Sequence, residues 1–211
     1  GTLRAFGHYN GDHLCYGDLN FSLNTRLHWH NALGGITWQR DDADASLYVT
    51  EMGNTLSLEM ESMKMNIPSG ILQAGAKGSK RWSVSNVNLE TGISADYYRI
   101  RPQGVSSSGL GTDNVSQVRH DNSCMARIWG NAEVPLTRLI VLEAGLEVNA
   151  YFAEGGYHRI DPDPRLTLRF NIGDGDLSLH AGRYHQYIHT VGMSEIGMPS
   201  NFKLAASQSC G

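Results

Sequence analysis

The stretch from Pro164 to His189 constrains the fold more than any other, because it contains two alternating runs joined by a tight turn. Apolar residues take every second position from Leu166 to Ile172 and again from Leu177 to Ala181. A side-chain period of two is typical of a strand with one apolar face and one polar face. The glycines of the turn suit the positive φ that hairpin turns require. The stretch therefore predicts an antiparallel β-hairpin.

The same alternation recurs along the chain and predicts an all-β fold. It is clean over residues 18–29, 87–98, 124–134 and 139–152; a strand with small residues on one face is expected at 71–82, and shorter strands at 3–9 and 36–40. Between Leu56 and Ile67 the apolar parity reverses, which we interpret as a bulge or a distorted loop arm. We expect 71–82 to pair with 87–98 and 164–172 to pair with 177–188, within about nine or ten strands in all.

The connections between these strands alternate in length. The sequence predicts turns at 10–12, 30–35, 83–86, 135–138 and 173–176, and longer loops at 41–54 or beyond, 101–122, 154–163 and from 189 onward. The best strands also exceed the usual ~5–6 residues and reach the ~9–11 that a tilted membrane strand needs. An up-and-down meander with short turns on one rim and long loops on the other is typical of an outer-membrane β-barrel.

Bulk composition narrows the function classes. A net charge of -4 gives no reason to expect a nucleic-acid partner. No run of about 18 apolar residues predicts a transmembrane helix, which leaves the β route through a membrane open. The three cysteines, Cys15, Cys124 and Cys210, are far apart and lack metal-ligand spacing, so we interpret them as unpaired thiols. No nucleophile motif, phosphate loop or CxxC pair is present, so no enzyme and no cofactor are predicted.

The two parities of the long strands predict two faces with different surroundings. The apolar set carries no charge, which a membrane demands and a soluble sandwich only prefers. We expect the apolar side chains to face lipid on the convex outside: Leu19, Phe21, Leu23, Leu27, Leu89, Ile93, Leu142, Leu146, Leu166, Leu168 and Phe170. We expect the polar side chains to face the lumen on the concave inside: Asn24, Arg26, Glu90, Asp96, Arg127, Glu143, Glu147, Arg165 and Arg169.

Three segments carry a family resemblance in order along the chain. They are YGDLNFSLNTRLHWHNAL, NVNLETGISADYYRIRP and DPDPRLTLRFNIGDGDLSLHAGRYHQYIH, the last followed by a Gly197-Met198-Pro199-Ser200 loop. The set resembles the barrel of TonB-dependent outer-membrane receptors, particularly those of Bacteroides-like bacteria. Members of that family carry an N-terminal plug domain and a barrel of about 22 strands. Residues 1–211 therefore resemble the middle part of such a barrel, without the plug.

The resemblance implies a location in the bacterial outer membrane and energy-coupled uptake of a scarce solute. An iron–siderophore complex, haem, cobalamin or a glycan would fit, and the partners would be lipid, the plug and the TonB complex. Such a fragment should form a curved open sheet with two free edges. One alternative is a small complete outer-membrane barrel with a structural or adhesive role, in which strand 3–9 would pair with 177–188. A second is a soluble all-β binding module.

Several polar clusters have both a functional and a structural interpretation. His28 and His30 share one strand face and could bind zinc, but no third ligand is spaced nearby, and His180, His185 and His189 have mixed parity. Glu143 and Glu147 with the neighbouring arginines could do acid–base chemistry, although a lumen-side charge lattice is favoured. The Asp161–Pro164 run lacks the periodicity of a calcium loop and suggests a stiff loop exit. The aromatic residues at strand ends suit either interfacial girdles or the caps of a soluble core: Trp29, Trp82, Tyr97, Tyr98, Tyr151, Tyr184 and Tyr187.

Overall fold

The computed structural model describes residues 1–18, 23–61, 63–104, 106–109, 112–116, 119–172, 175–191 and 201–204. Within these ranges no helix is long and apolar enough to span a membrane. The strands are β1 (Thr2–Asp18), β2 (Leu23–Gln39), β3 (Ala43–Met60), β4 (Met63–Val84), β5 (Val87–Arg101), β6 (Ser106–Gly109), β7 (Thr112–Ser116), β8 (Asp121–Pro135), β9 (Ile140–Ala153), β10 (His158–Ile172), β11 (Gly175–Gly182), β12 (Ile188–Val191) and β13 (Asn201–Leu204).

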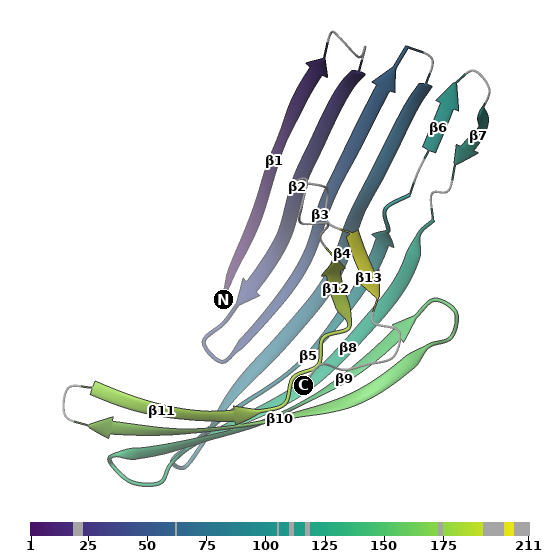
Figure 1. Cartoon of the computed structure of the whole chain (residues 1–211). Coiled ribbons are helices and arrows are strands. Elements are labelled where there is room, and N and C mark those ends of the chain that lie inside the picture. The colour runs from purple at the N-terminus through teal and green to yellow at the C-terminus, as the bar shows by residue number, and fades with distance from the viewer. Residues whose placement is uncertain are drawn as a thin grey trace.

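The main sheet is an antiparallel meander in the order β1-β2-β3-β4-β5-β8-β9-β10-β11, with β6 and β7 attached beside β4. Figure 1 shows one curved sheet, in which the long strands β1–β4 stand upright and β9–β11 cross below them. Among the described residues, no ladder joins β1 to β11, so the sheet is open at both edges. The short β12–β13 hairpin lies within the curve (Figure 1). The predicted all-β, open, up-and-down meander is confirmed.

Both predicted hairpins are present and extend to their turns, but the predicted pairing of 177–188 with 164–172 is wrong beyond Gly182, where β11 ends and the chain leaves the sheet. β4 pairs with β5 from Gly70↔Arg101 to Val84↔Val87. β10 pairs with β11 from Arg165↔Gly182 to Ile172↔Gly175. The turn residue Ser85 has a φ of 56°, the left-handed value that a two-residue hairpin turn needs.

Two predicted turns near the N-terminus are wrong. Residues 10–12 lie inside β1 and residues 30–35 lie inside β2, where Asn10 pairs with Asn31 and Gly7 with Gly34. Glycine and asparagine are common in turns, but they also occur inside strands when their backbone groups pair with a neighbouring strand, as they do here. At Gly35 there is also no room for a side chain, because an added Cβ would lie 2.7 Å from the Leu47 carbonyl oxygen and from the Phe6 ring.

Three other connections also differ from the prediction. Residues 43–60 form strand β3 rather than a long loop, so β2 and β3 join through a short turn at 40–42. The parity reversal near residue 61 is the β3–β4 hairpin, with Met60 paired to Met63, rather than a bulge. The predicted loop 154–163 is a short turn before β10, and the predicted loop 101–122 contains the β6–β7 hairpin. The loop predicted from 189 onward falls partly on β12 and β13 and partly outside the described residues.

The pairing register assigns every side chain of the sheet to one of two faces. The face that carries Asp96 is called the inner face, because the segment after β11 folds back across it. Its packed centre is Tyr98 and Ile100 of β5, with Ile71, Met125 and Ile188 against them. The opposite face is called the outer face. It is exposed, and its middle rows are apolar.

Three consecutive rows of paired residues form a continuous apolar belt on the outer face. They contain small and apolar side chains only, and several are more than half exposed, including Leu47 at 62%, Ile93 at 63% and Ile160 at 64%. The rows are Gly7, Gly34, Val49, Ala74, Tyr97, Cys124 and Phe152; Ala5, Ile36, Leu47, Ala76, Ala95, Ala126, Ala150 and Ile160; and Leu3, Trp38, Ala45, Gly78, Ile93, Ile128, Val148 and Pro162. On β9 the belt continues through Leu146, Ala144 and Leu142 to Ile140. That is about 40 Å along the strand at ~3.3 Å per residue.

The predicted grouping of apolar side chains on one face holds for β5, β9 and β10 and fails for β2. Leu23 and Leu27 lie on the inner face with Asp96, whereas Asn24 and Arg26 lie on the outer face. On the inner face, Leu27 is the direct neighbour of Leu14 on β1 and of Leu56 on β3, nearer the Leu23 end of β2 than the rows of the belt are. The apolar parity of β2 therefore changes midway, from Leu27 inside to Ile36 and Trp38 outside, and the prediction followed only its first half. Leu19 and Phe21 lie outside the described residues.

Candidate functional site on the inner face

A buried carboxylate occupies the middle of the inner face. The Asp96 side chain is 0% exposed, and its Oδ2 lies 2.9 Å from Arg127 Nη2. Gln73 donates to Asp96 Oδ1 at 2.9 Å, and the Tyr48 hydroxyl donates to the same oxygen. Arg127 also donates to Ser94 Oγ at 3.0 Å. Four neighbouring strands, β3, β4, β5 and β8, thus converge on one charge, as alternate residues of paired strands must do when they share a face.

A second group of polar side chains lies on β10, next to the point where the β10–β11 ladder ends at two prolines. Pro162 and Pro164 point to the outer face of β10, so the alternate residues Asp161 and Asp163 point to the inner face. The Pro164 carbonyl accepts a hydrogen bond from the Arg183 N–H at 3.0 Å, on the side of β11. Since proline lacks an N–H, β11 cannot extend its ladder past Gly182. The chain leaves the sheet there and crosses the inner face.

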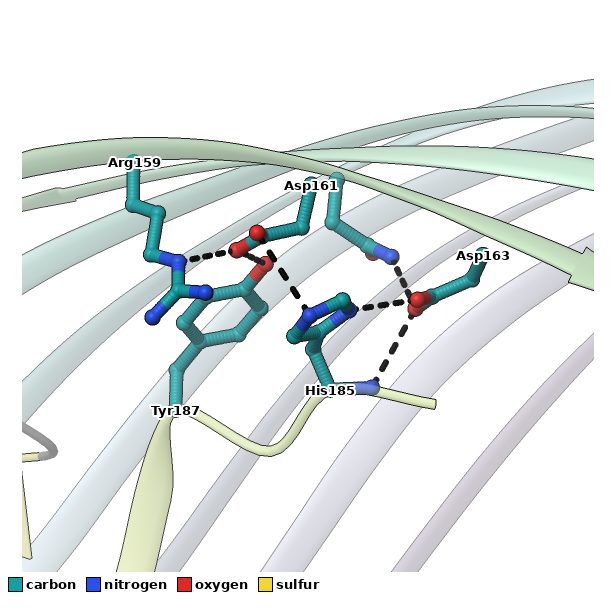
Figure 2. Close-up of polar contacts among 6 residues, drawn as sticks. Arg159, Asp161, Asp163, His185 and Tyr187 are labelled. Carbon is teal, nitrogen blue, oxygen red and sulfur yellow. Dashed lines mark hydrogen bonds and ion pairs between the residues drawn. The ribbon is translucent and has the colours of Figure 1, made fainter. Parts of the chain in front are cut away.

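His185 and Tyr187 hold this crossing segment on the two aspartates (Figure 2). His185 is 1% exposed; its Nδ1 lies 2.5 Å from Asp163 Oδ1, and its Nε2 lies 3.5 Å from Asp161 Oδ1. Tyr187 donates to Asp161 Oδ2 at 2.8 Å, and Arg159 Nε lies 2.6 Å from the same oxygen. We call residues 183–187 the strap. Nε2 is buried and makes no hydrogen bond within the described residues, so its 3.5 Å approach to Asp161 is an electrostatic contact.

Further contacts fix the strap at both ends of this cluster. The ring of Tyr187 stacks on Tyr151 of β9, with centroids 4.9 Å apart and planes 9° apart. Asn149 donates to Asp163 Oδ2 at 2.8 Å, so the carboxylate that faces His185 is also tied to β9. Burial, and then the hydrogen bond to Asp161, raise the pKa of the Tyr187 phenol. The phenol therefore keeps its proton and donates to Asp161 at any physiological pH.

Nearer the short turns, the inner face is more open. Arg165 donates twice to Asn131 Oδ1, at 3.1 and 2.7 Å, and Arg169 pairs with Glu143. Asn88 donates to Glu133 at 3.4 Å. All of these side chains except Arg169 line a hollow of about 680 Å³, together with Glu90. Glu133 and Glu143 are direct neighbours across β8 and β9, and each carboxylate has a partner of its own, Asn88 for Glu133 and Arg169 for Glu143.

The structure places the remaining predicted lumen residues on the inner face. Glu90, Asp96, Arg127, Glu143, Glu147, Arg165 and Arg169 all share it, while Asn24 and Arg26 do not. The strap contacts were missed by sequence reasoning, which assigned Asp161–Pro164 to a loop exit and found no common face for the histidines. The available signal was the two-residue spacing of Asp161 and Asp163 on what is a strand, with prolines at the positions between them.

The alternative metal interpretations find no support in the geometry. Across the described part of the chain, no three His, Cys, Asp or Glu side chains gather in a way that could hold a metal ion. His28 and His30 lie on the outer face with their rings stacked 5.8 Å apart. Cys15 and Cys124 are free and exposed, and Cys210 lies outside the described residues.

The aromatic residues divide between the two faces. Trp82 and Tyr97 lie on the outer face and are 47% and 40% exposed; Tyr97 stands in the first row of the belt and Trp82 beyond its third row, positions that suit an interfacial girdle. Trp38, which was not among the predicted girdle residues, joins them on the outer face at 40%. Trp29, Tyr98 and Tyr151 lie on the inner face instead, and both tyrosines are buried there.

The contacts of the strap predict a local stability that depends on His185. We expect His185→Ala to increase amide hydrogen exchange across residues 183–188 by about tenfold or more, because it removes the partner of two buried carboxylates. The measurement is hydrogen exchange by mass spectrometry. His180→Ala is the matched control, since His180 is exposed and its imidazole hydrogen-bonds to Thr167 across the hairpin. Equal exchange in both variants would show that the contacts of His185 with Asp161 and Asp163 do not hold the strap on the sheet.

No protein-family model matches this chain, and no curated protein sequence matches it.

Proposed function

We propose that the chain is a section of the barrel of a TonB-dependent transporter in a bacterial outer membrane, which takes up a scarce solute with energy from the inner membrane. The observation that carries the proposal is the contrast between the two faces of one long-stranded sheet. The outer face has a charge-free belt, and the inner face has a lattice of paired charges that includes Asp96 and Arg127. A spanning sheet needs that division, because lipid solvates no charge and a lumen solvates many.

The open edges support a section of a larger barrel over a small complete one. A membrane strand cannot leave its edge N–H and C=O groups unpaired in lipid, and β1 and β11 have such edges within the described residues. Strands from elsewhere in a longer chain would close the barrel. The strap would then lie in the lumen against the inner face, where Asp161 and Asp163 hold it.

The test is uptake by cells that express the complete reading frame containing this chain. We expect cells with the intact gene to accumulate one member of a panel of labelled ferric siderophores, haem, cobalamin and oligosaccharides. Deletion of the gene, deletion of TonB, or a protonophore should each abolish that uptake. Accumulation that survives the loss of TonB and of the proton gradient, or a protein recovered in the soluble fraction, would refute the proposal.

A further inference from the structure

A small hollow with basic walls lies on the outer face, next to the apolar belt. Its volume is about 260 Å³, and its lining includes Glu51, Gly53, Gly70, Leu72, Arg99, Arg101 and His120. The register explains the depression: Gly53, Gly70 and Arg101 are direct neighbours on β3, β4 and β5. An added Cβ at Gly70 would stand 2.9 Å from the Met52 carbonyl oxygen and 3.7 Å from Arg101 Nη2. Gly70 therefore forms the floor and Arg101 forms one wall, while the His30 ring covers Gly53, where an added Cβ would lie 2.4 Å from His30 Cε1.

The donors in this hollow are incompletely used. Arg101 Nε is buried and has no hydrogen-bond partner in the described part of the chain, and the same holds for His120 Nδ1. A guanidinium has five donors and no acceptor, so the missing partner of Arg101 must be an acceptor. The acidic residue in the lining, Glu51, lies 3.7 Å from His30 Nε2 on β2. Arg99 reaches the same hollow from the row next to Arg101 and is exposed.

The position of the hollow indicates where its ligand comes from. The adjacent row of the sheet is Val49, Ala74 and Tyr97, the first row of the apolar belt. Arginine forks match the oxygens of phosphate in geometry as well as charge. A molecule with a phosphate at one end and hydrocarbon at the other could place the first in the hollow and the second on the belt. The hollow also lies toward the strand ends that carry the β6–β7 connection, the longer-loop rim, which faces the cell exterior in outer-membrane barrels.

We propose that this hollow binds the phosphate of a membrane lipid in the outer leaflet, with the lipid's acyl chains against the belt. The inference rests on the proposed membrane location and adds a partner to it. Arg99, Arg101 and His120 supply the hydrogen-bond donors, and Gly70 leaves the floor of the hollow without a side chain. The ligand chemistry is a phosphate monoester or diester. The apolar row beside the hollow favours a phosphate carried by a lipid over a free phosphate ion, because acyl chains can pack against that row.

The experiment uses the full-length protein, purified from outer membranes and delipidated in detergent. Native mass spectrometry then measures binding of phosphatidic acid, of diacylglycerol with the same chains, and of inorganic phosphate. We expect phosphatidic acid to bind at least about tenfold more tightly than either of the others. Arg101→Gln should weaken that binding about tenfold, the effect of one charge-assisted hydrogen bond. His120→Ala should weaken it in the same direction.

Arg26→Gln is the matched control, since Arg26 is a cation of the outer face that does not line the hollow. Heat-modifiable gel mobility of every sample reports whether the barrel is folded. A heat-modifiable Arg101→Gln protein that binds phosphatidic acid like the wild type would overturn the inference and leave the proposed function intact. Equal binding of inorganic phosphate would overturn the lipid assignment, and equal binding of diacylglycerol would overturn the phosphate. A wild-type protein without heat-modifiable mobility would refute the membrane barrel itself.

Discussion

Leu146→Arg is expected to lower the free energy of unfolding of the membrane-inserted protein by about 2–4 kcal/mol, the cost of an arginine near the midplane on the lipid side of a barrel. Leu146 is 49% exposed on the outer face. It lies halfway along the apolar outer positions of β9, which run from Ile140 to Phe152. A change of that size is a large part of a typical stability of ~5–15 kcal/mol. The folded, heat-modifiable band in outer-membrane fractions should therefore fall sharply.

Glu147→Arg provides the matched control, because the adjacent residue of a strand points to the opposite face. Glu147 faces inward, in register with Trp129 and Asp163. The variant introduces the same arginine one position away, and we expect it to assemble and to change transport at most. The membrane-barrel proposal fails if the Leu146 variant folds normally while the Glu147 variant does not. A soluble sheet with a protein layer over the belt would instead show the Leu146 defect in a water-soluble protein.

The elements that could be predicted from the sequence are those in which one apolar parity persists from end to end. The part of β4 that pairs with β5 and the β10–β11 hairpin are of this kind, since their turns fall where alternation stops. β1 to β3 defeat the same reasoning because they extend past the belt. β2 presents Leu27 to an inner-face cluster and Ile36 to the outer face. A change of surroundings along one strand looks, in sequence, like the end of one strand and the start of another.

Sequence parity predicts the shared face of Asp96 and Arg127 but not the contacts of the strap. Asp96 and Arg127 share a face by parity alone, and their contact follows from the register of adjacent strands. The strap is different, because His185 reaches Asp163 from 22 positions away, through a segment without periodicity. Nothing local to residues 183–187 specifies that they fold back over β10. The reason lies in Pro162 and Pro164, which end the β11 ladder and leave the inner aspartates uncovered.

The largest stability effect expected on the inner face is that of Asp96→Ala. The substitution removes the fully buried carboxylate that Arg127, Gln73 and Tyr48 share; Arg127 then keeps only Ser94, and Gln73 only Tyr98, as a side-chain acceptor among the described residues. Removing one partner of a buried ion pair costs about 3–5 kcal/mol, because the remaining charge is buried and uncompensated. The Arg127 side chain is 31% exposed and regains some solvation, so we expect a value near the lower end, about 3 kcal/mol. Urea unfolding in detergent, followed by tryptophan fluorescence, measures it.

Glu143→Gln is the comparison that shows whether the loss of stability in Asp96→Ala comes from the burial of the carboxylate or from the loss of a charge alone. Glu143 pairs with Arg169 on the same face, but the two side chains are 34% and 40% exposed. Exposed pairs contribute about 0–1 kcal/mol, so this variant should unfold close to the wild type. Adding Arg127→Met to Asp96→Ala should restore part of the loss, because the double variant no longer buries an unpaired charge. Equal losses for Asp96→Ala and Glu143→Gln would mean that Asp96 is hydrated in the folded protein, and that the centre of the inner face is wet rather than closed by its four strands.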